Sequence, residues 1–327
     1  MGAVEHREIE VGTLRMHVAE QGSGPLVVLL HGFPESWYSW RHQLAALAEA
    51  GFHAVAPDER GYGRTDRPEA TEAYTLLHLV GDVVGLIGAL GEERAVVVGH
   101  DWGAPVAWHT ALLRPDRVLG VAGLSVPFTP RGWRAPIVRW REAFGDRFYQ
   151  VYFQEPGVAE GELEADVAET MRRILVGLSG DRARIGGGGG RPSGVLAPGG
   201  GFLAELDRGE ALPPWLGQED LDFYVAELSR TGFRGGLSWY RNNERNWELL
   251  APWHGARVTP PALYVAGDRD PVVRFPGMDR ILAGLGTCVP DLRASVMLEG
   301  CGHWTQQERP DEVNEQLVAF CRAVAGG

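Results

Sequence analysis

A single aspartate lies where the sequence predicts a sharp turn from a strand into a helix. The segment Val97–Ala104 reads VVGHDWGA, with Asp101 at the apex and small residues on either side. In the serine version of this motif, G-x-S-x-G, such a turn holds a nucleophile exposed above a sheet. An ionised carboxylate needs no base before it attacks carbon, and its attack gives an alkyl-enzyme ester. Asp101 is therefore the candidate nucleophile, and the alternative is an aspartate that only caps its helix.

A histidine and two aspartates follow the last two predicted strands. His303, in the segment GCGHW, comes directly after the last strand and about 200 residues beyond Asp101. Asp268 and Asp270 share the loop after the preceding strand. Turn preferences near Gly267 favour Asp270 as the acid, with Asp268 as its rival. The order nucleophile, acid, histidine is the one used on doubly wound hydrolase sheets, so we expect His303 to act as a base that the acid orients.

Two further sets of groups can stabilise a developing negative charge. The HGFP loop follows the first central strand, and backbone N–H groups in such a loop and just after the nucleophile form an oxyanion hole. We therefore assign the N–H groups of Phe33 and Trp102 to this role. Tyr149 and Tyr240 lie in the middle of the chain, and a phenol can donate a proton to an alkoxide. Tyrosines are more often core aromatics, and Tyr152 lies one helical turn beyond Tyr149.

The elements that must position these residues alternate between strand and helix. We expect strands over residues 7–20 (two, around a turn), 25–30, 52–57, 95–99, 118–125, 262–266 and 293–298, and helices over 36–50, 74–90, 102–113, 275–285 and 310–324. This alternation predicts an α/β fold with a mostly parallel, doubly wound sheet. The alternation breaks in the middle of the chain. We expect a core of residues 1–127 and 251–327, and a largely helical cap over 128–250 inserted after a central strand.

The composition excludes several chemistries. All 31 positive side chains are arginine, so lysine-based Schiff-base, pyridoxal-phosphate and phosphate-loop mechanisms are ruled out. The net charge of −12 argues against nucleic acid or an anionic membrane as partner, and no apolar run approaches the roughly 20 residues of a membrane span. The N-terminus is polar rather than a signal peptide. The three cysteines, Cys288, Cys301 and Cys321, lack metal-ligand spacing, so we expect free thiols, no metal and a cytoplasmic location.

Six segments together resemble one known family. They are HGFPESWYSWR (31–41), GYGRTD (61–66), GHDWGA (99–104), YQVYFQEPG (149–157), GFRGGLSWYRNNERNW (232–247) and GCGHWTQ (300–306). Over nearly its whole length the chain resembles a soluble, cytosolic-type epoxide hydrolase of the α/β-hydrolase superfamily, in a bacterial form without the N-terminal phosphatase-like domain of the vertebrate enzyme. The glycine-rich part of the insertion, 186–201, matches no motif of that family, and we read it as a flexible loop that leaves the pocket size open.

The resemblance implies roles for individual residues. Asp101 would be the nucleophile, His303 the base, Asp270 the orienting acid, Tyr149 and Tyr240 the proton donors, and the Phe33 and Trp102 amides the oxyanion hole. The implied reaction converts an epoxide into a vicinal diol through a hydroxyalkyl ester on the nucleophile, which a histidine-activated water then hydrolyses. We expect a small apolar epoxide and water as the only partners, no cofactor, and a monomer or homodimer. Substrate contacts are expected from Trp102, Phe33, Gln150 and Trp304.

Two alternative functions use the same fold. A haloalkane dehalogenase has the same Asp-His-Asp triad, but that family usually has Asn or Glu at the position of Phe33. Two tyrosines in the cap also favour an oxygen leaving group over a halide. A non-catalytic binding protein would keep the pocket and lose the triad, whereas here every expected position is filled.

Overall fold

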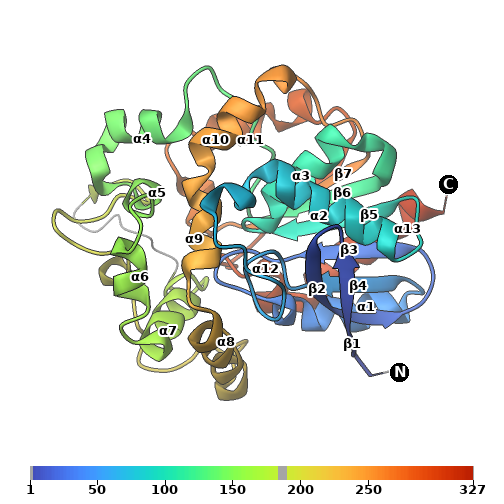
Figure 1. Cartoon of the computed structure of the whole chain (residues 1–327), viewed down its shortest axis with the longest axis horizontal. Coiled ribbons are helices and arrows are strands. Elements are labelled where there is room, and N and C mark those ends of the chain that lie inside the picture. Colours follow the sequence, from blue (N-terminus) through green and yellow to red (C-terminus); the bar gives the residue numbers. More distant parts are fainter. Residues whose placement is uncertain (1–2, 183–189, 327) are drawn as a thin grey trace.

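The computed structural model describes residues 3–182 and 190–326, and its centre is a sheet of eight strands (Figure 1). The strands are β1 (Glu5–Val11), β2 (Leu14–Gly22), β3 (Leu26–Leu30), β4 (His53–Pro57), β5 (Ala95–His100), β6 (Val118–Leu124), β7 (Ala262–Gly267) and β8 (Leu292–Leu298). Their order across the sheet is β1-β2-β4-β3-β5-β6-β7-β8. β2 pairs antiparallel with β1 and β4, and all other neighbours are parallel. The α/β fold class predicted from the sequence is confirmed.

Helices connect the parallel strands and form the segment between β6 and β7. The helices outside that segment are α1 (Arg41–Glu49), α2 (Leu76–Ala89), α3 (Gly103–Leu113), α11 (Met278–Cys288), α12 (Thr305–Glu308) and α13 (Pro310–Ala325). Between β6 and β7 lie α4 (Pro136–Phe144), α5 (Tyr149–Tyr152), α6 (Val158–Leu163), α7 (Val167–Gly177), α8 (Gln218–Thr231), α9 (Arg234–Arg241) and α10 (Asn243–Leu249). Short 3-10 turns occupy Trp37–Trp40, Thr71–Tyr74, Pro115–Arg117, Gly145–Arg147, Leu203–Glu205, Ala251–Trp253 and Val272–Arg274.

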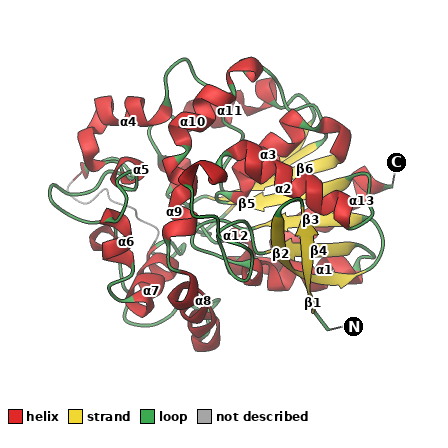
Figure 2. Cartoon of the chain, in the orientation of Figure 1, coloured by secondary structure: helices red, strands yellow, loops and turns green. Residues whose placement is uncertain are grey.

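Both faces of the sheet are covered, which explains the uninterrupted apolar runs of its central strands. All five residues of β3 are buried, and successive side chains point to opposite faces. Val28 packs in the cluster that contains residues of α2 and α3, whereas Val27 packs in the cluster that contains residues of α1 and α13. Figure 2 shows these helices as layers on the two sides of the strands.

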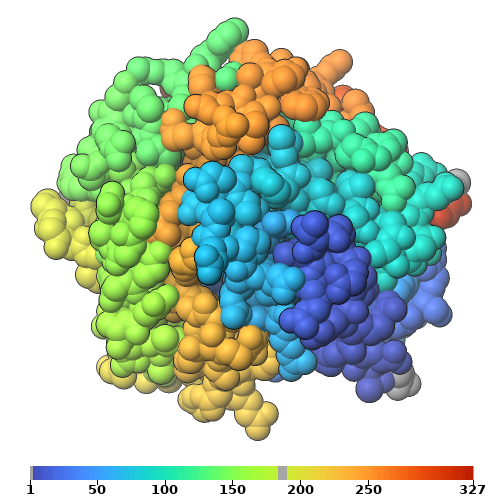
Figure 3. Space-filling model, viewed as in Figure 1, coloured from blue at the N-terminus to red at the C-terminus, as the bar shows by residue number. Residues whose placement is uncertain are grey.

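The helices between β6 and β7 lie together on one side of the sheet, opposite the side on which both chain ends lie (Figure 1). In the space-filling view the green and yellow surface on the left belongs to this segment, and its last helices, α9 and α10, are orange (Figure 3). Within the predicted glycine-rich loop, residues 186–189 fall outside the described part of the chain, and Gly199–Gly201 lie in a turn and loop. None of the helices described is long and apolar enough to cross a membrane.

Two predicted helices begin later than expected. The helix predicted over 36–50 starts as a 3-10 turn capped by the hydroxyl of Ser36, and α1 follows from Arg41. The helix predicted from residue 275 begins at Met278, because Gly277 adopts a left-handed backbone conformation (φ 88°) that ends the preceding loop.

Candidate active site

Asp101 occupies a strained turn between β5 and α3. Its φ of 49° lies in the left-handed region, which costs a residue other than glycine about 1–3 kcal/mol. Three glycines make the turn possible by close contact: a Cβ atom on Gly99 would collide with the carbonyl of Gly103, one on Gly103 with the carbonyl of Leu30, and one on Gly32 with the Asp101 side chain. The turn therefore has the geometry of a nucleophile elbow, with the Asp101 carboxylate at its apex.

The two carboxylate oxygens of Asp101 have different surroundings. Oδ1 accepts a hydrogen bond of 2.8 Å from the backbone N–H of Phe33. Oδ2 lies 3.5 Å from Nε2 of His303. Burial opposes ionisation, but the hydrogen bond and positive charge of His303 outweigh it and hold the pKa of Asp101 below its usual value. Asp101 is thus ionised at neutral pH, with Oδ2 turned towards the histidine.

His303 lies between the two aspartates. Its Nδ1 is 3.1 Å from Oδ1 of Asp270, which is fully buried, and 3.2 Å from the hydroxyl of Ser125. Asp268 is instead exposed and accepts a hydrogen bond of 2.8 Å from the N–H of Gly300, so it joins two loops. The geometry favours Asp270 over Asp268 as the acid that orients the histidine.

The charge state of His303 depends on both neighbours. Burial by itself would lower the pKa of this imidazole. The negative charges of Asp270 and Asp101, and a hydrogen bond to each of them, instead raise that pKa well above its usual value. In the free protein His303 is therefore an imidazolium between two carboxylates. Loss of the charge on Asp101 would remove one of the two groups that keep it protonated.

Tyr149 on α5 and Tyr240 on α9 are both buried, with ring centroids 6.0 Å apart. The Tyr240 ring packs edge-on against the rings of Phe33 (5.5 Å between centroids) and Trp102 (5.1 Å). Phe33 donates its N–H to Asp101, and Trp102 follows Asp101 in the chain. Gln154 joins the two helices, since its side chain donates to the carbonyls of Gln150 and Tyr240. Burial is the main cause that raises the pKa of both phenols, and the charge of Asp101 adds to it. Both phenols are therefore neutral at neutral pH.

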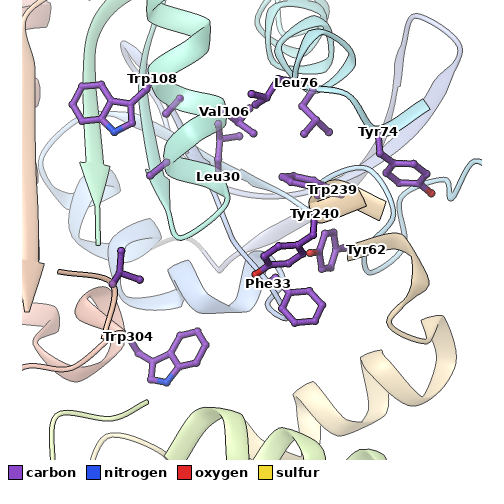
Figure 4. Close-up of a cluster of buried hydrophobic side chains, with 14 of the residues drawn as sticks. Leu30, Phe33, Tyr62, Tyr74, Leu76, Val106, Trp108, Trp239, Tyr240 and Trp304 are labelled. Carbon is purple, nitrogen blue, oxygen red and sulfur yellow. The ribbon is translucent and has the colours of Figure 1, made fainter. Parts of the chain in front are cut away.

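Glycines allow α9 to approach the core closely. A Cβ on Gly235 would collide with the carbonyl of Gly61, and one on Gly236 with the Tyr62 hydroxyl and the Phe33 ring. The Trp239 indole donates a 3.1 Å hydrogen bond to the carbonyl of Arg60. Figure 4 shows the result, with Tyr240 beside Phe33 and Tyr62. The segment GFRGGLSWYR thus positions Tyr240 over the nucleophile turn.

A cavity of about 320 Å³ opens above Asp101, within the size range of small-molecule sites. Trp102, Gln150, Tyr149 and Tyr240 line it together with Asp101. Its other lining residues are Leu76, Pro105, His109, Val126, Thr129, Pro130, Arg131, Gly132, Arg134, Pro136, Arg139, Trp140, Asn243, Asn246, Trp247, Leu250, Val272, Phe275, Pro276, Met278 and Ile281.

Two of the predicted substrate contacts lie elsewhere. Trp304 is fully buried, donates its indole N–H to the carbonyl of Leu175, and packs edge-on against His303 (4.7 Å) instead of lining the cavity. Its bulk supports the imidazole from behind, so we correct its expected role from substrate contact to packing. The Phe33 ring is also packed away, among cap aromatics, and only its N–H reaches the nucleophile. Among the described residues no cluster of His, Cys, Asp or Glu could hold a metal ion.

Sequence reasoning missed a buried pair behind the nucleophile. His100 Nδ1 lies 2.8 Å from Glu35 Oε2, and its Nε2 lies 2.8 Å from the backbone oxygen of His303. The charge of His100 outweighs burial and lowers the pKa of Glu35, so this carboxylate is ionised. Both ring nitrogens of His100 therefore face oxygen atoms of other residues. Glu35 also accepts from the N–H of Gly32, so the pair joins the HGFP loop, the nucleophile turn and the histidine loop.

The fold and the carboxylate nucleophile turn define a protein of the α/β-hydrolase class, and residues 25–310 match the family described as alpha/beta hydrolase fold. The chain is 48% identical to Epoxide hydrolase A of Mycobacterium tuberculosis over 98% of both chains. It is 43% identical to Epoxide hydrolase 1 of Siraitia grosvenorii over 98% of this chain and 99% of the other.

Solved structures agree with these relatives. Epoxide Hydrolase A from Mycobacterium thermoresistibile superposes with a TM-score of 0.91 at 48% identity, covering 98% of this chain and 99% of the other. An epoxide hydrolase from an endophytic Streptomyces gives 0.93 at 46% identity, covering 99% and 97%. This chain therefore belongs to the epoxide hydrolases of the α/β-hydrolase superfamily, the bacterial soluble type.

Proposed function

We propose that this protein hydrolyses epoxides to vicinal diols in two chemical steps. The observation that carries the proposal is that the Asp101 carboxylate and the phenols of Tyr149 and Tyr240 line one cavity. A nucleophile on one wall and two neutral proton donors from the cap are what opening a strained three-membered ether requires. No cofactor takes part in either step.

In the first step Oδ2 of Asp101 attacks one epoxide carbon from the side opposite the ring oxygen. The C–O bond of the ring breaks, and the oxygen takes a proton from Tyr149 or Tyr240 as charge develops on it. Oδ1 keeps its hydrogen bond from Phe33 and becomes the carbonyl oxygen of the ester. The product is a hydroxyalkyl ester on Asp101, and the phenol regains a proton that originates from the imidazolium of His303.

The ester changes the protonation of His303. Esterified Asp101 carries no charge, so one of the two carboxylates that raise the pKa of His303 is lost. The neutral imidazole, oriented by Asp270, then takes a proton from water, and the hydroxide attacks the ester carbonyl carbon. The oxyanion forms on Oδ1, where the N–H groups of Phe33 and Trp102 stabilise it, a contribution of about 3–4 kcal/mol per donor in comparable sites. The intermediate collapses as the bond between the acyl carbon and Oδ2 breaks, and Oδ2 takes the proton of the added hydroxyl and leaves with the diol. Asp101 is again a carboxylate, and His303 keeps the proton that it took from water.

The role of the inserted segment follows from the same geometry. Residues 128–250 act as a cap that brings both phenols over the nucleophile, while 1–127 and 251–327 form the catalytic core. The substrate is a small apolar epoxide, Trp102 and Gln150 contact it in the cavity, and we place the protein in the cytoplasm as a monomer or homodimer.

A haloalkane dehalogenase would use the same triad on a carbon–halogen bond. The two phenols favour an oxygen leaving group, and the full-length relatives are named epoxide hydrolases. The test is a panel of styrene oxide, small aliphatic epoxides and 1-chloroalkanes, with diol and chloride both measured. Diol formation that disappears in Asp101→Ala supports the proposal. Chloride release without diol would assign the dehalogenase function instead, and tight epoxide binding without turnover would indicate a binding protein.

A further inference from the structure

The charges that line the cavity are unusual for this chain. The protein carries a net charge of −12, yet the lining contains three arginines, Arg131, Arg134 and Arg139. Among the described residues that line the cavity, Asp101 is the only carboxylate. Arg134 forms an ion pair of 2.5 Å with Glu142, and both side chains are largely exposed. The other two arginines have no carboxylate partner within residues 3–182 and 190–326.

Arg131 and Arg139 are both held against tryptophans that line the same cavity. The guanidinium of Arg131 lies 3.9 Å from the ring centroid of Trp247, and its Nε donates to the carbonyl of that residue. The guanidinium of Arg139, on α4, lies 4.6 Å from the ring centroid of Trp140. α4 and α10, which carry these two tryptophans, lie next to each other at the top of Figure 1. Stacking fixes the plane of a guanidinium and leaves its edge free to donate hydrogen bonds.

Such an arrangement fits an anionic group. A guanidinium edge pairs with carboxylate or phosphate through two parallel hydrogen bonds, and a stacked side chain loses little freedom when it does so. Arg139 is exposed while still lining the cavity, which places it where the cavity opens to solvent. Partial burial without a counter-charge lowers the pKa of Arg139, in keeping with a cation that has no carboxylate partner. Most of the other lining side chains are apolar or aromatic, which suits the rest of the ligand.

The cavity, at about 320 Å³, is of a size that takes a small molecule. Building on the proposed function, we propose that, among small and otherwise apolar epoxides, the preferred substrates carry an anionic headgroup, a carboxylate or phosphate monoester. Arg139, at the mouth of the cavity, is the specificity-determining residue that receives this headgroup, and Arg131 is a second unpaired cation in the same lining.

The first test compares matched substrates on the complete protein. A short ω-epoxy carboxylic acid, the phosphate monoester of the corresponding epoxy alcohol, and the primary amide of the acid differ mainly in headgroup. We expect kcat/KM for at least one anionic substrate to exceed that for the amide about tenfold or more, with the difference in KM. Because the arginines are partly exposed, added salt reduces the preference. The relative rates of acid and phosphate identify the headgroup.

The second test assigns the preference to a residue. In Arg139→Gln the ratio of the amide KM to the anionic KM falls towards one. The matched control is Arg141→Gln on the same helix, which removes one positive charge from an exposed pair with Asp146 and leaves the ratio unchanged. If Arg139→Gln and Arg141→Gln change the ratio equally, or if the wild type does not prefer an anionic substrate, the inference is wrong. Failure to hydrolyse any of the three epoxides would instead count against the proposed epoxide hydrolase function.

Discussion

Removal of the phenol hydroxyls tests the proposed first step without changing the nucleophile. The variants are Tyr149→Phe, Tyr240→Phe and the double variant, each of which keeps the buried ring and its aromatic contacts. Both hydroxyls line the cavity with the nucleophile, and burial raises the pKa of each, so each is a neutral donor at neutral pH. The expected defect is therefore confined to ring opening.

The magnitude follows from the hydrogen bonds that each hydroxyl would make to the developing alkoxide. A hydrogen bond to a charged group is worth about 1.5–3 kcal/mol. At 1.4 kcal/mol for each factor of ten, each single variant forms the ester about 10- to 150-fold more slowly. If the two phenols act independently, the double variant loses about 3–6 kcal/mol, which is two to four powers of ten in rate.

Single-turnover fluorescence measures this step directly. Trp102 follows the nucleophile in sequence, lines the cavity and lies 5.1 Å from the Tyr240 ring, so its emission should change when the ester forms. The control is Tyr152→Phe. Tyr152 lies three residues beyond Tyr149, but its hydroxyl donates to Glu162 at 2.8 Å and does not line the cavity, so this variant should keep its rate within about twofold. Wild-type ester formation in both single variants, or an equal loss in the control, would refute the assignment.

Three further predictions concern the surroundings of the site. In Gly236→Ala the new methyl group collides with the core and moves α9, so the free energy of unfolding falls by about 1–3 kcal/mol and turnover falls with it. The control is Gly161→Ala on α6, where the methyl group meets open space, and thermal unfolding should show no loss of stability. In Asp270→Asn ester hydrolysis slows by about 10²- to 10⁴-fold in rapid-quench kinetics, whereas Asp268→Asn stays within a few-fold, and equal effects would exclude Asp270 as the orienting acid. Because the pKa of His303 is higher in the folded than in the unfolded protein, its protonation stabilises the fold. This stabilisation is complete below the unfolded-state pKa near 6.5 and is lost as pH rises through the folded-state pKa. Denaturant titrations should therefore show that the difference in unfolding free energy between wild type and His303→Gln shrinks over that pH range.

The parts of the site that are local in sequence could be predicted from it. The nucleophile turn is one example, because it needs small residues at fixed positions around Asp101, and that spacing is visible in the letters alone. The parallel sheet is another, because strands covered on both faces read as short apolar runs.

Contacts between distant segments could not be predicted in this way. Glu35 and His100 are 65 residues apart, and nothing in either motif shows that the two side chains meet. The substrate role expected for Trp304 was wrong for the same reason, since its contact with Leu175 spans 129 residues and turns the indole away from the cavity. The two arginine–tryptophan stacks in the cavity lining also depend on how residues 128–250 fold.

The covalent ester on Asp101 is the central claim, and mass spectrometry of His303→Gln tests it most directly. Without the base, the ester forms and is not hydrolysed. We predict that in this variant the peptide containing Asp101 gains the full mass of the epoxide. Wild-type protein that turns over in heavy-oxygen water should incorporate the label into Asp101, whereas the diol of a single turnover should not carry the label. An unmodified Asp101 in the variant, together with solvent label in the first diol, would contradict the covalent mechanism.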